Sequence, residues 1–133
     1  MAFYLDTNIC IYYLKGLYPA LPDNLLARQV SEIKIASIVK AELLFGAARS
    51  KKQADNTKLV EQFLLPFEVV AFDDQSAQIY ARIRSELVAK GFSIGPNDLI
   101  LAATVLAREG VLITNNEQKF KRVPGLQIEN WIH

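Results

Sequence analysis

The sequence contains one cysteine and one histidine among its 133 residues. A single cysteine, Cys10, leaves no internal disulfide to form, which favours a reducing compartment over an oxidising one. Because His133 is the only histidine and lies at the chain end, the sequence offers no histidine and cysteine set for zinc and no base for a catalytic thiol. We expect Cys10, which lies in an apolar segment, to pack as a small hydrophobic side chain.

Long apolar runs and an excess of charge of one sign are also missing. No apolar run approaches the roughly 20 residues of a membrane span, and the N-terminus has neither the basic start nor the long apolar stretch of a signal peptide. We therefore expect a cytoplasmic protein with no membrane partner. The 15 lysines and arginines nearly balance the 14 acids, so net charge indicates no polyanionic partner. If the substrate is nucleic acid, something other than overall basicity must attract it.

Short apolar segments alternate with helical stretches along the whole chain. This pattern predicts an α/β fold in a single domain over residues 1–133, with a mostly parallel central sheet and helices on both faces. The expected strands cover residues 3–5, 33–36, 69–72, 111–113 and 126–131. The expected helices cover residues 9–15, 24–30, 38–48, 77–90 and 99–108, with a further helix ending at Pro66 and a short turn at Phe120. Thr7 or Asn8 is the expected cap of the first helix and Asp23 that of the second.

Polar side chains interrupt the apolar pattern at places that this topology sends to one edge of the sheet. Asp6 directly follows the first strand, Glu42 lies about one turn into the helix after the second, and Asp98 lies at the start of the helix before the fourth. Asn115 and Asn116 follow the fourth strand. Ligands of open α/β sheets bind outside the carboxyl ends of the strands. These side chains therefore share one cleft if the first, second and fourth strands are neighbours.

Crowded carboxylates need a counter-charge, a shared proton or a hydrated metal ion. Mg²⁺, or Mn²⁺ in its place, prefers oxygen ligands and keeps several of its waters. Such an ion lowers the pKa of a bound water and polarises a phosphoryl oxygen, while a free carboxylate can accept the proton of the water. The acids therefore favour phosphodiester hydrolysis, with the ion supplying the positive charge that the surface lacks on average.

Each of these residues also has a purely structural interpretation. Asp6 can cap the first helix or end a strand, Glu42 can be a solvated helix residue, and Asp98 can be a helix N-cap. Asn115 and Asn116 can simply form a turn. Only the combined arrangement favours a site.

Four motifs follow one another along the chain: Leu5-Asp6-Thr7-Asn8, Ala41-Glu42-Leu43, Ile94-Gly95-Pro96-Asn97-Asp98 and Leu112-Ile113-Thr114-Asn115-Asn116. In this order and at these separations they resemble the PIN-domain ribonucleases, and among them the VapC-type toxins of bacterial toxin–antitoxin modules. The resemblance implies a PIN-like fold and a metal-dependent endoribonuclease that acts as the toxin. It also implies a homodimer, and a cognate VapB-type antitoxin that neutralises the toxin from a groove near the acids.

By the same resemblance, the metal-binding and catalytic acids fall on Asp6, Glu42 and Asp98. Many PIN domains have a further aspartate where this chain has Asn116, which we include among the catalytic candidates. An amide can ligate through its oxygen or orient a water, but it adds no negative charge, so one bound ion is favoured over two. Glu117, the next residue, is an alternative source of the missing charge.

Two larger sets of residues are candidate contacts with partners. Basic residues near the motifs can contact an RNA backbone, or can be ordinary solvated charges: Lys40, Arg49, Lys51, Lys52, Lys119, Lys121 and Arg122. Apolar residues early in the chain can form a partner surface or pack in the core: Leu17, Tyr18, Leu21, Leu25 and Leu26.

Two other functions remain open at this point. An aspartate after the first strand also suits phosphatases that form an aspartyl-phosphate. Those enzymes have the motif Asp-x-Asp at this point, whereas this chain has Asn8 in place of the second aspartate. The other alternative is a catalytically inactive PIN-like binding module. Retention of Asp6, Glu42 and Asp98 together argues against it.

Overall fold

The computed structural model describes residues 1–133, and its centre is one sheet of five parallel strands in the order β3-β2-β1-β4-β5. The strands are β1 (Phe3–Leu5), β2 (Ile33–Ala36), β3 (Glu68–Val70), β4 (Val111–Ile113) and β5 (Gln127–Glu129). The predicted first, second and fourth strands are therefore neighbours, with β1 between β2 and β4. This order brings the carboxyl ends of all three strands to one edge of the sheet.

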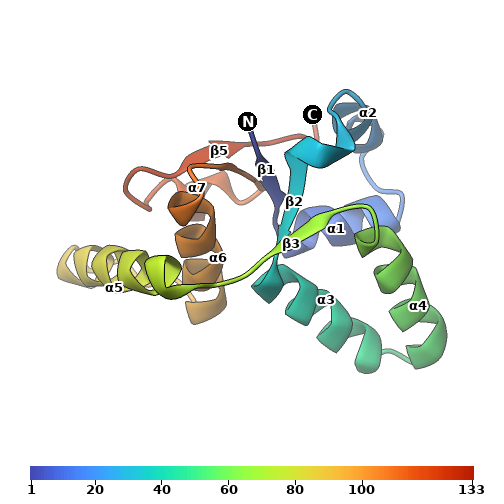
Figure 1. Ribbon diagram of the computed structural model, residues 1–133, viewed down its shortest axis with the longest axis horizontal. Helices are drawn as coiled ribbons and strands as arrows, with labels where there is room; N and C mark the ends of the chain where they lie inside the picture. The colour runs from blue at the N-terminus through green and yellow to red at the C-terminus, as the bar shows by residue number, and fades with distance from the viewer.

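Helices cover both faces of the sheet, as the alternating pattern predicted. They are α1 (Thr7–Leu14), α2 (Ala20–Leu26), the 3-10 helix η1 (Val30–Glu32), α3 (Ser37–Ala48), α4 (Gln53–Leu64), α5 (Asp74–Ala89), α6 (Pro96–Ala107) and α7 (Glu117–Phe120). In Figure 1, α5 and α6 lie to the left of the strands, and α1, α2 and α4 lie to the right. No helix combines the length and the apolar character that crossing a lipid bilayer would require.

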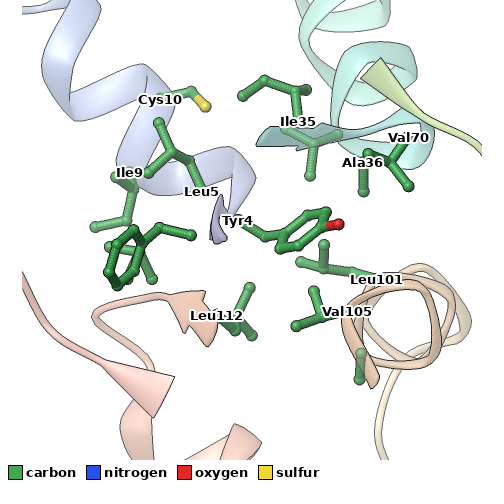
Figure 2. Close-up of a cluster of buried hydrophobic side chains, with 14 of the residues drawn as sticks. Tyr4, Leu5, Ile9, Cys10, Ile35, Ala36, Val70, Leu101, Val105 and Leu112 are labelled. Atoms are coloured by element: carbon green, nitrogen blue, oxygen red, sulfur yellow. The ribbon is translucent and has the colours of Figure 1, made fainter. Parts of the chain in front are cut away.

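The central strand β1 is buried on both faces, which explains its uniformly apolar sequence. Successive side chains of a strand point to opposite faces. Figure 2 shows Tyr4 pointing toward Leu101 of α6 and Leu5 lying on the side of Cys10 in α1. Cys10 is fully buried, and this burial, reinforced by the charge of nearby Asp6, raises the pKa of its thiol well above the usual value. The cysteine therefore packs as a small hydrophobic side chain, as expected.

The predicted caps of the first two helices are wrong. Asp6 itself caps α1, since its carboxylate accepts a hydrogen bond from the backbone N–H of Ile9 at 2.8 Å. The helix α2 begins at Ala20 with Pro19 at its N-cap position, so Asp23 lies inside the first turn. Proline already has a helix-like φ, here −57°, and can therefore start the helix earlier than the aspartate.

Several predicted boundaries also shift. The strand β3 is Glu68–Val70, because its register pairs it with the three residues from Lys34 to Ala36, and not the predicted 69–72. The edge strand β5 pairs only with the three residues of β4, so it is shorter than the predicted 126–131. The helices α3, α5 and α6 each begin one to three residues before the predicted positions, since Asp73 caps α5 and Pro96 starts α6.

Candidate active site

Asp6 lies where β1 passes directly into α1. Its backbone N–H donates to the carbonyl of Ile113 at 3.0 Å, which ties this junction to the end of β4. Its side chain is only 6% exposed and caps α1 through Ile9. Asp6 therefore has the helix-capping role considered above, and Oδ1 of its carboxylate is the capping atom.

Opposing interactions act on the pKa of the Asp6 carboxyl, and their balance raises it. Burial raises the pKa of its carboxyl above the usual value, and the negative charge of Asp98 acts in the same direction. Hydrogen bonds from the Thr114 side chain and from the N–H of Ile9, together with the charge of Lys119, lower the pKa and offset part of this effect. A buried carboxyl whose charge is only partly compensated is a group that gains from a nearby cation.

Glu42 projects from α3 and is held by two side chains from other elements. The hydroxyl of Thr7, in the first turn of α1, donates to Oε1 of Glu42. The amide of Asn97, in the first turn of α6, donates to Oε2 at 3.3 Å. Glu42 is therefore not a freely solvated helix residue, because both of its oxygens are oriented by the elements that carry Asp6 and Asp98.

Asp98 lies in the first turn of α6, at the positive end of the helix dipole. It is not the N-cap, since Gly95 has that position. Oδ2 of Asp98 lies 2.7 Å from Nζ of Lys119, and the two side chains are about one-third exposed. The carboxylate of Asp98 therefore has a protein cation as its partner.

Asn116 caps the short helix α7 through Oδ1, which accepts a hydrogen bond from the N–H of Lys119 at 3.3 Å. The structural role of Asn116 is thus helix capping, in line with the turn-forming interpretation. Glu117 does not lie in the cavity described below, because its carboxylate is exposed and accepts a hydrogen bond from Asn130 at 3.1 Å. Glu117 therefore does not supply the charge that Asn116 lacks.

All four candidate residues line one small cavity of about 130 Å³, which we call the acid cavity. Its lining residues are Asp6, Thr7, Asn8, Glu42, Asp98, Leu101, Asn116, Lys119 and Phe120. This volume is about that of four liquid waters, which suits a small ion that keeps part of its hydration shell. No group of three or more histidine, cysteine, aspartate or glutamate side chains is gathered closely enough to hold a metal ion directly. The oxygen-only donor set fits Mg²⁺ or Mn²⁺ by its chemistry, with waters or side-chain movement completing the contacts.

Sequence reasoning missed the side chains that orient the acids. Thr7 was expected only as a helix cap, and Asn97 only as part of a tight helix entry. Both lie beside an acid in the motifs Asp6-Thr7 and Asn97-Asp98, so adjacency to the acids was the available signal. Lys119 was named only as one of seven basic residues, and nothing in the sequence placed it against an acid 21 residues earlier.

The other residues named as partner contacts divide between surface and core. Of the seven basic residues, only Lys119 lines the acid cavity. Among the early apolar residues, Leu21 and Leu25 are buried in the core, while Leu26 is 81% exposed. Leu25 and Leu26 also line a groove of about 460 Å³ between α1, α2 and α4, which we call the apolar groove. Its other lining residues are Tyr13, Leu14, Arg28, Val30, Ile33, Leu59, Gln62, Phe63, Pro66 and Phe67.

A third cavity shares lining residues with both the apolar groove and the acid cavity. Leu14 and Leu59 line both the apolar groove and a neighbouring cavity of about 390 Å³ between α1, α3 and α4. Glu42 lines both this neighbouring cavity and the acid cavity. The three cavities therefore lie next to one another, with Leu14 and Leu59 between the first two and Glu42 between the last two.

Comparison with known proteins agrees with this architecture. The family model for the PIN domain matches residues 3–126. The chain is 40% identical to "Ribonuclease VapC2" of Rickettsia felis and 37% identical to "tRNA(fMet)-specific endonuclease VapC" of Salmonella typhimurium, with 98% of each chain covered in both comparisons. Among solved structures, that of VapBC2 from Rickettsia felis bound to a promoter DNA fragment matches with a TM-score of 0.92 and 38% identity, covering 98% of this chain and 99% of that one. With β1 between β2 and β4 and the four motifs in place, the chain belongs to the PIN domain family and, within it, to the VapC ribonucleases.

Proposed function

We propose that the chain is the toxin of a toxin–antitoxin pair and acts in the cytoplasm as an endoribonuclease that depends on Mg²⁺ or Mn²⁺. One observation carries this proposal: the β1, α3 and α6 elements deliver Asp6, Glu42 and Asp98 to the same cavity. The nuclease activity in the names of the relatives supports the reaction class. The oxygen-only donors support a hard divalent ion.

Asp6, Glu42 and Asp98 would hold the ion, with the amide oxygen of Asn116 as a neutral fourth donor. When bound, the ion supplies charge stabilisation at the phosphoryl oxygen and a water of lowered pKa. The chain's own residues orient the donors: Ile9 and Thr114 fix Asp6, while Thr7 and Asn97 fix Glu42. One carboxylate oxygen of the set accepts the proton of the attacking water.

We further propose transfer RNA as the substrate class. The Salmonella relative is named for specificity toward tRNA(fMet) and matches over nearly the whole of both chains. A nearly neutral protein gains little affinity from overall charge, so the ion in the acid cavity provides a focused attraction for the phosphate backbone.

The experiment is cleavage of total transfer RNA by the purified chain, with Mg²⁺, with Mn²⁺ and with EDTA. Asp98→Asn removes a proposed ligand charge while keeping the volume of the side chain, so we expect cleavage to fall by at least about 100-fold, as for an essential group. Asp55→Asn is the matched control, because Asp55 is an exposed acid of α4 that does not line the acid cavity. Cleavage in EDTA, or wild-type cleavage by Asp98→Asn, would contradict the proposal. Absence of cleavage in every condition would favour the inactive binding module.

We also infer a VapB-type antitoxin as the partner and place its contact in the apolar groove. The support is the solved structure of a VapBC2 complex among the relatives and the lining residues that the neighbouring cavity shares with the apolar groove and with the acid cavity. A partner segment with apolar side chains can lie between α1, α2 and α4 and extend past Leu14 and Leu59 toward Glu42. Leu26, 81% exposed in the isolated chain, would gain the most from such cover.

Co-purification with the antitoxin of the same module tests this contact. Leu26→Asp places a charge in the apolar groove and should weaken the complex by at least about tenfold while leaving transfer RNA cleavage unchanged. Val88→Asp is the control, since Val88 is also exposed, at 67%, but lies on α5 outside the apolar groove. Equal complex formation by Leu26→Asp and wild type would place the antitoxin elsewhere.

We propose a homodimer, on the strength of the family resemblance. Light scattering during size-exclusion chromatography measures it directly. Twice the chain mass of 14.9 kDa is 29.8 kDa, and a particle of 14.9 kDa across the accessible concentrations would refute the dimer.

A further inference from the structure

Lys119 is the one cation among the residues that line the acid cavity. Its backbone is fixed, because Asn116 caps α7 through the N–H of Lys119 and the next residue, Phe120, is buried to 1% exposure. From this fixed position the ammonium reaches Asp98, with 2.7 Å between Nζ and Oδ2. The side chain also passes over Phe120, with Nζ 5.6 Å from the ring centroid.

The contact puts Lys119 in conflict with any cation that uses Asp98. A carboxylate that accepts a hydrogen bond from an ammonium and also binds a divalent ion places two positive centres within a few ångström, and like charges at that distance repel. The three acids of the cavity carry three negative charges at most, and Lys119 cancels one of them. Asn116 adds none, so the cavity presents two negative charges to an incoming ion while Lys119 is in place and three once Lys119 has withdrawn.

We propose that Lys119 is a built-in competitor of the divalent ion: its ammonium holds Asp98 in the metal-free protein and must leave when the ion enters. This inference rests on the proposed metal site and concerns the regulation of its affinity. The ion pair lowers the metal affinity of the chain, so that the cavity fills only when the divalent ion is abundant. An ion pair elsewhere on the surface would not lower the metal affinity, because neither of its side chains would be a ligand of the ion.

Titration of Mn²⁺ into the metal-free chain, followed by the electron paramagnetic resonance signal of free Mn²⁺, tests the proposal. Lys119→Met keeps the aliphatic stem and removes the charge. We expect it to bind Mn²⁺ about fivefold more tightly than wild type, since a partly exposed ion pair contributes up to about that factor to an equilibrium. Lys119→Arg keeps a cation in reach of Asp98 and should bind as wild type does. Lys121→Met is the matched control, because Lys121 is an exposed lysine two residues away that does not line the cavity.

The outcomes separate this inference from the proposed function. Equal affinity in Lys119→Met and wild type, or weaker binding by the variant, would overturn the competition while leaving the metal site in place. Absence of Mn²⁺ binding in all variants at millimolar concentrations would overturn the metal site itself, and the competition with it. Lys119→Gln provides a second neutral side chain, so that the test does not depend on the folding of one variant, and thermal unfolding verifies that each protein is folded.

Discussion

Replacing Asp6 separates its structural role from its proposed chemical role. Asparagine retains an oxygen that can accept the hydrogen bond from Ile9 and therefore keeps the cap of α1. Alanine removes this acceptor, which costs about 1 kcal/mol for the lost cap. It also removes the acceptor of the Thr114 hydroxyl, at about 1–2 kcal/mol. The Thr114 oxygen still accepts the hydrogen bond from the N–H of Asn116. We expect Asp6→Ala to be less stable by about 2–3 kcal/mol, and Asp6→Asn to match or exceed wild-type stability at neutral pH.

The sign of the effect in Asp6→Asn follows from the raised pKa of Asp6. A carboxyl whose pKa is higher in the folded than in the unfolded state destabilises the fold when it is ionised, above the folded pKa. This destabilisation is relieved as the pH falls through the folded pKa, and it is absent below the unfolded pKa. Asparagine has no charge to bury, so any advantage of Asp6→Asn over wild type is present at pH 7 and disappears toward about pH 4.

Thermal unfolding and transfer RNA cleavage measure the two roles side by side. At this chain length 1 kcal/mol corresponds to about 4 °C, so Asp6→Ala should melt about 8–12 °C below wild type. Asp6→Asn should melt at or above the wild-type temperature and still lose cleavage, because it lacks the ligand charge. Melting of Asp6→Asn as low as that of Asp6→Ala would refute the cap assignment. Cleavage by Asp6→Asn at the wild-type rate would refute the proposed metal ligand.

Three further predictions follow from local contacts. A Cβ atom at Gly110 would lie 2.5 Å from Cε1 of the buried Tyr4 ring. Gly110→Ala should therefore lower the free energy of unfolding, measured by urea denaturation, by about 1–3 kcal/mol. Gly46→Ala is the control and should not lower it, because a Cβ atom there would have no atom within 4 Å. Thr7→Val removes the hydroxyl that donates to the carboxylate of Glu42. The affinity for Mn²⁺, measured by titration, should fall about tenfold. Unchanged affinity would show that this hydrogen bond does not contribute to binding of the ion. Asp73 caps α5, and the hydrogen bond that the backbone N–H of Ser76 donates to its carboxylate lowers the pKa of that carboxyl. The difference in unfolding free energy between wild type and Asp73→Ala should therefore be full at pH 7 and narrow as the pH falls through the folded pKa. A difference independent of pH would contradict the cap.

The parallel sheet was predictable from the sequence because it depends on topology, whereas the meeting of the acids was predicted only on the condition that the first, second and fourth strands are neighbours. Apolar runs that end in Asp6 and in Thr114 indicated buried parallel strands, and connections through helices fixed their direction. The order of the strands then brought Asp6, Glu42 and Asp98 to one cavity. No interaction of individual side chains was needed for this step, since the carboxyl ends of parallel strands lie at the same edge of the sheet.

The partners of each acid could not be predicted, because they depend on side-chain reach across elements. Lys119 lies on a helix of four residues, and only its position in space shows that it contacts Asp98. The cap of α1 was assigned to Thr7 or Asn8, whereas Asp6 both ends the strand and caps the helix. The sequence shows only that an aspartate follows the strand. The structure is needed to show that this one residue both ends β1 and caps α1.

The most direct measurement is the position of Mn²⁺ in crystals of the protein, located by its anomalous scattering. The account predicts one peak inside the acid cavity, bound to carboxylate oxygens of Asp6 and Asp98, with Glu42 bound directly or through water. The same crystals should show Lys119 withdrawn from Asp98. A peak outside this cavity, or no peak at millimolar Mn²⁺, would contradict the claim that these acids form the metal site of a ribonuclease.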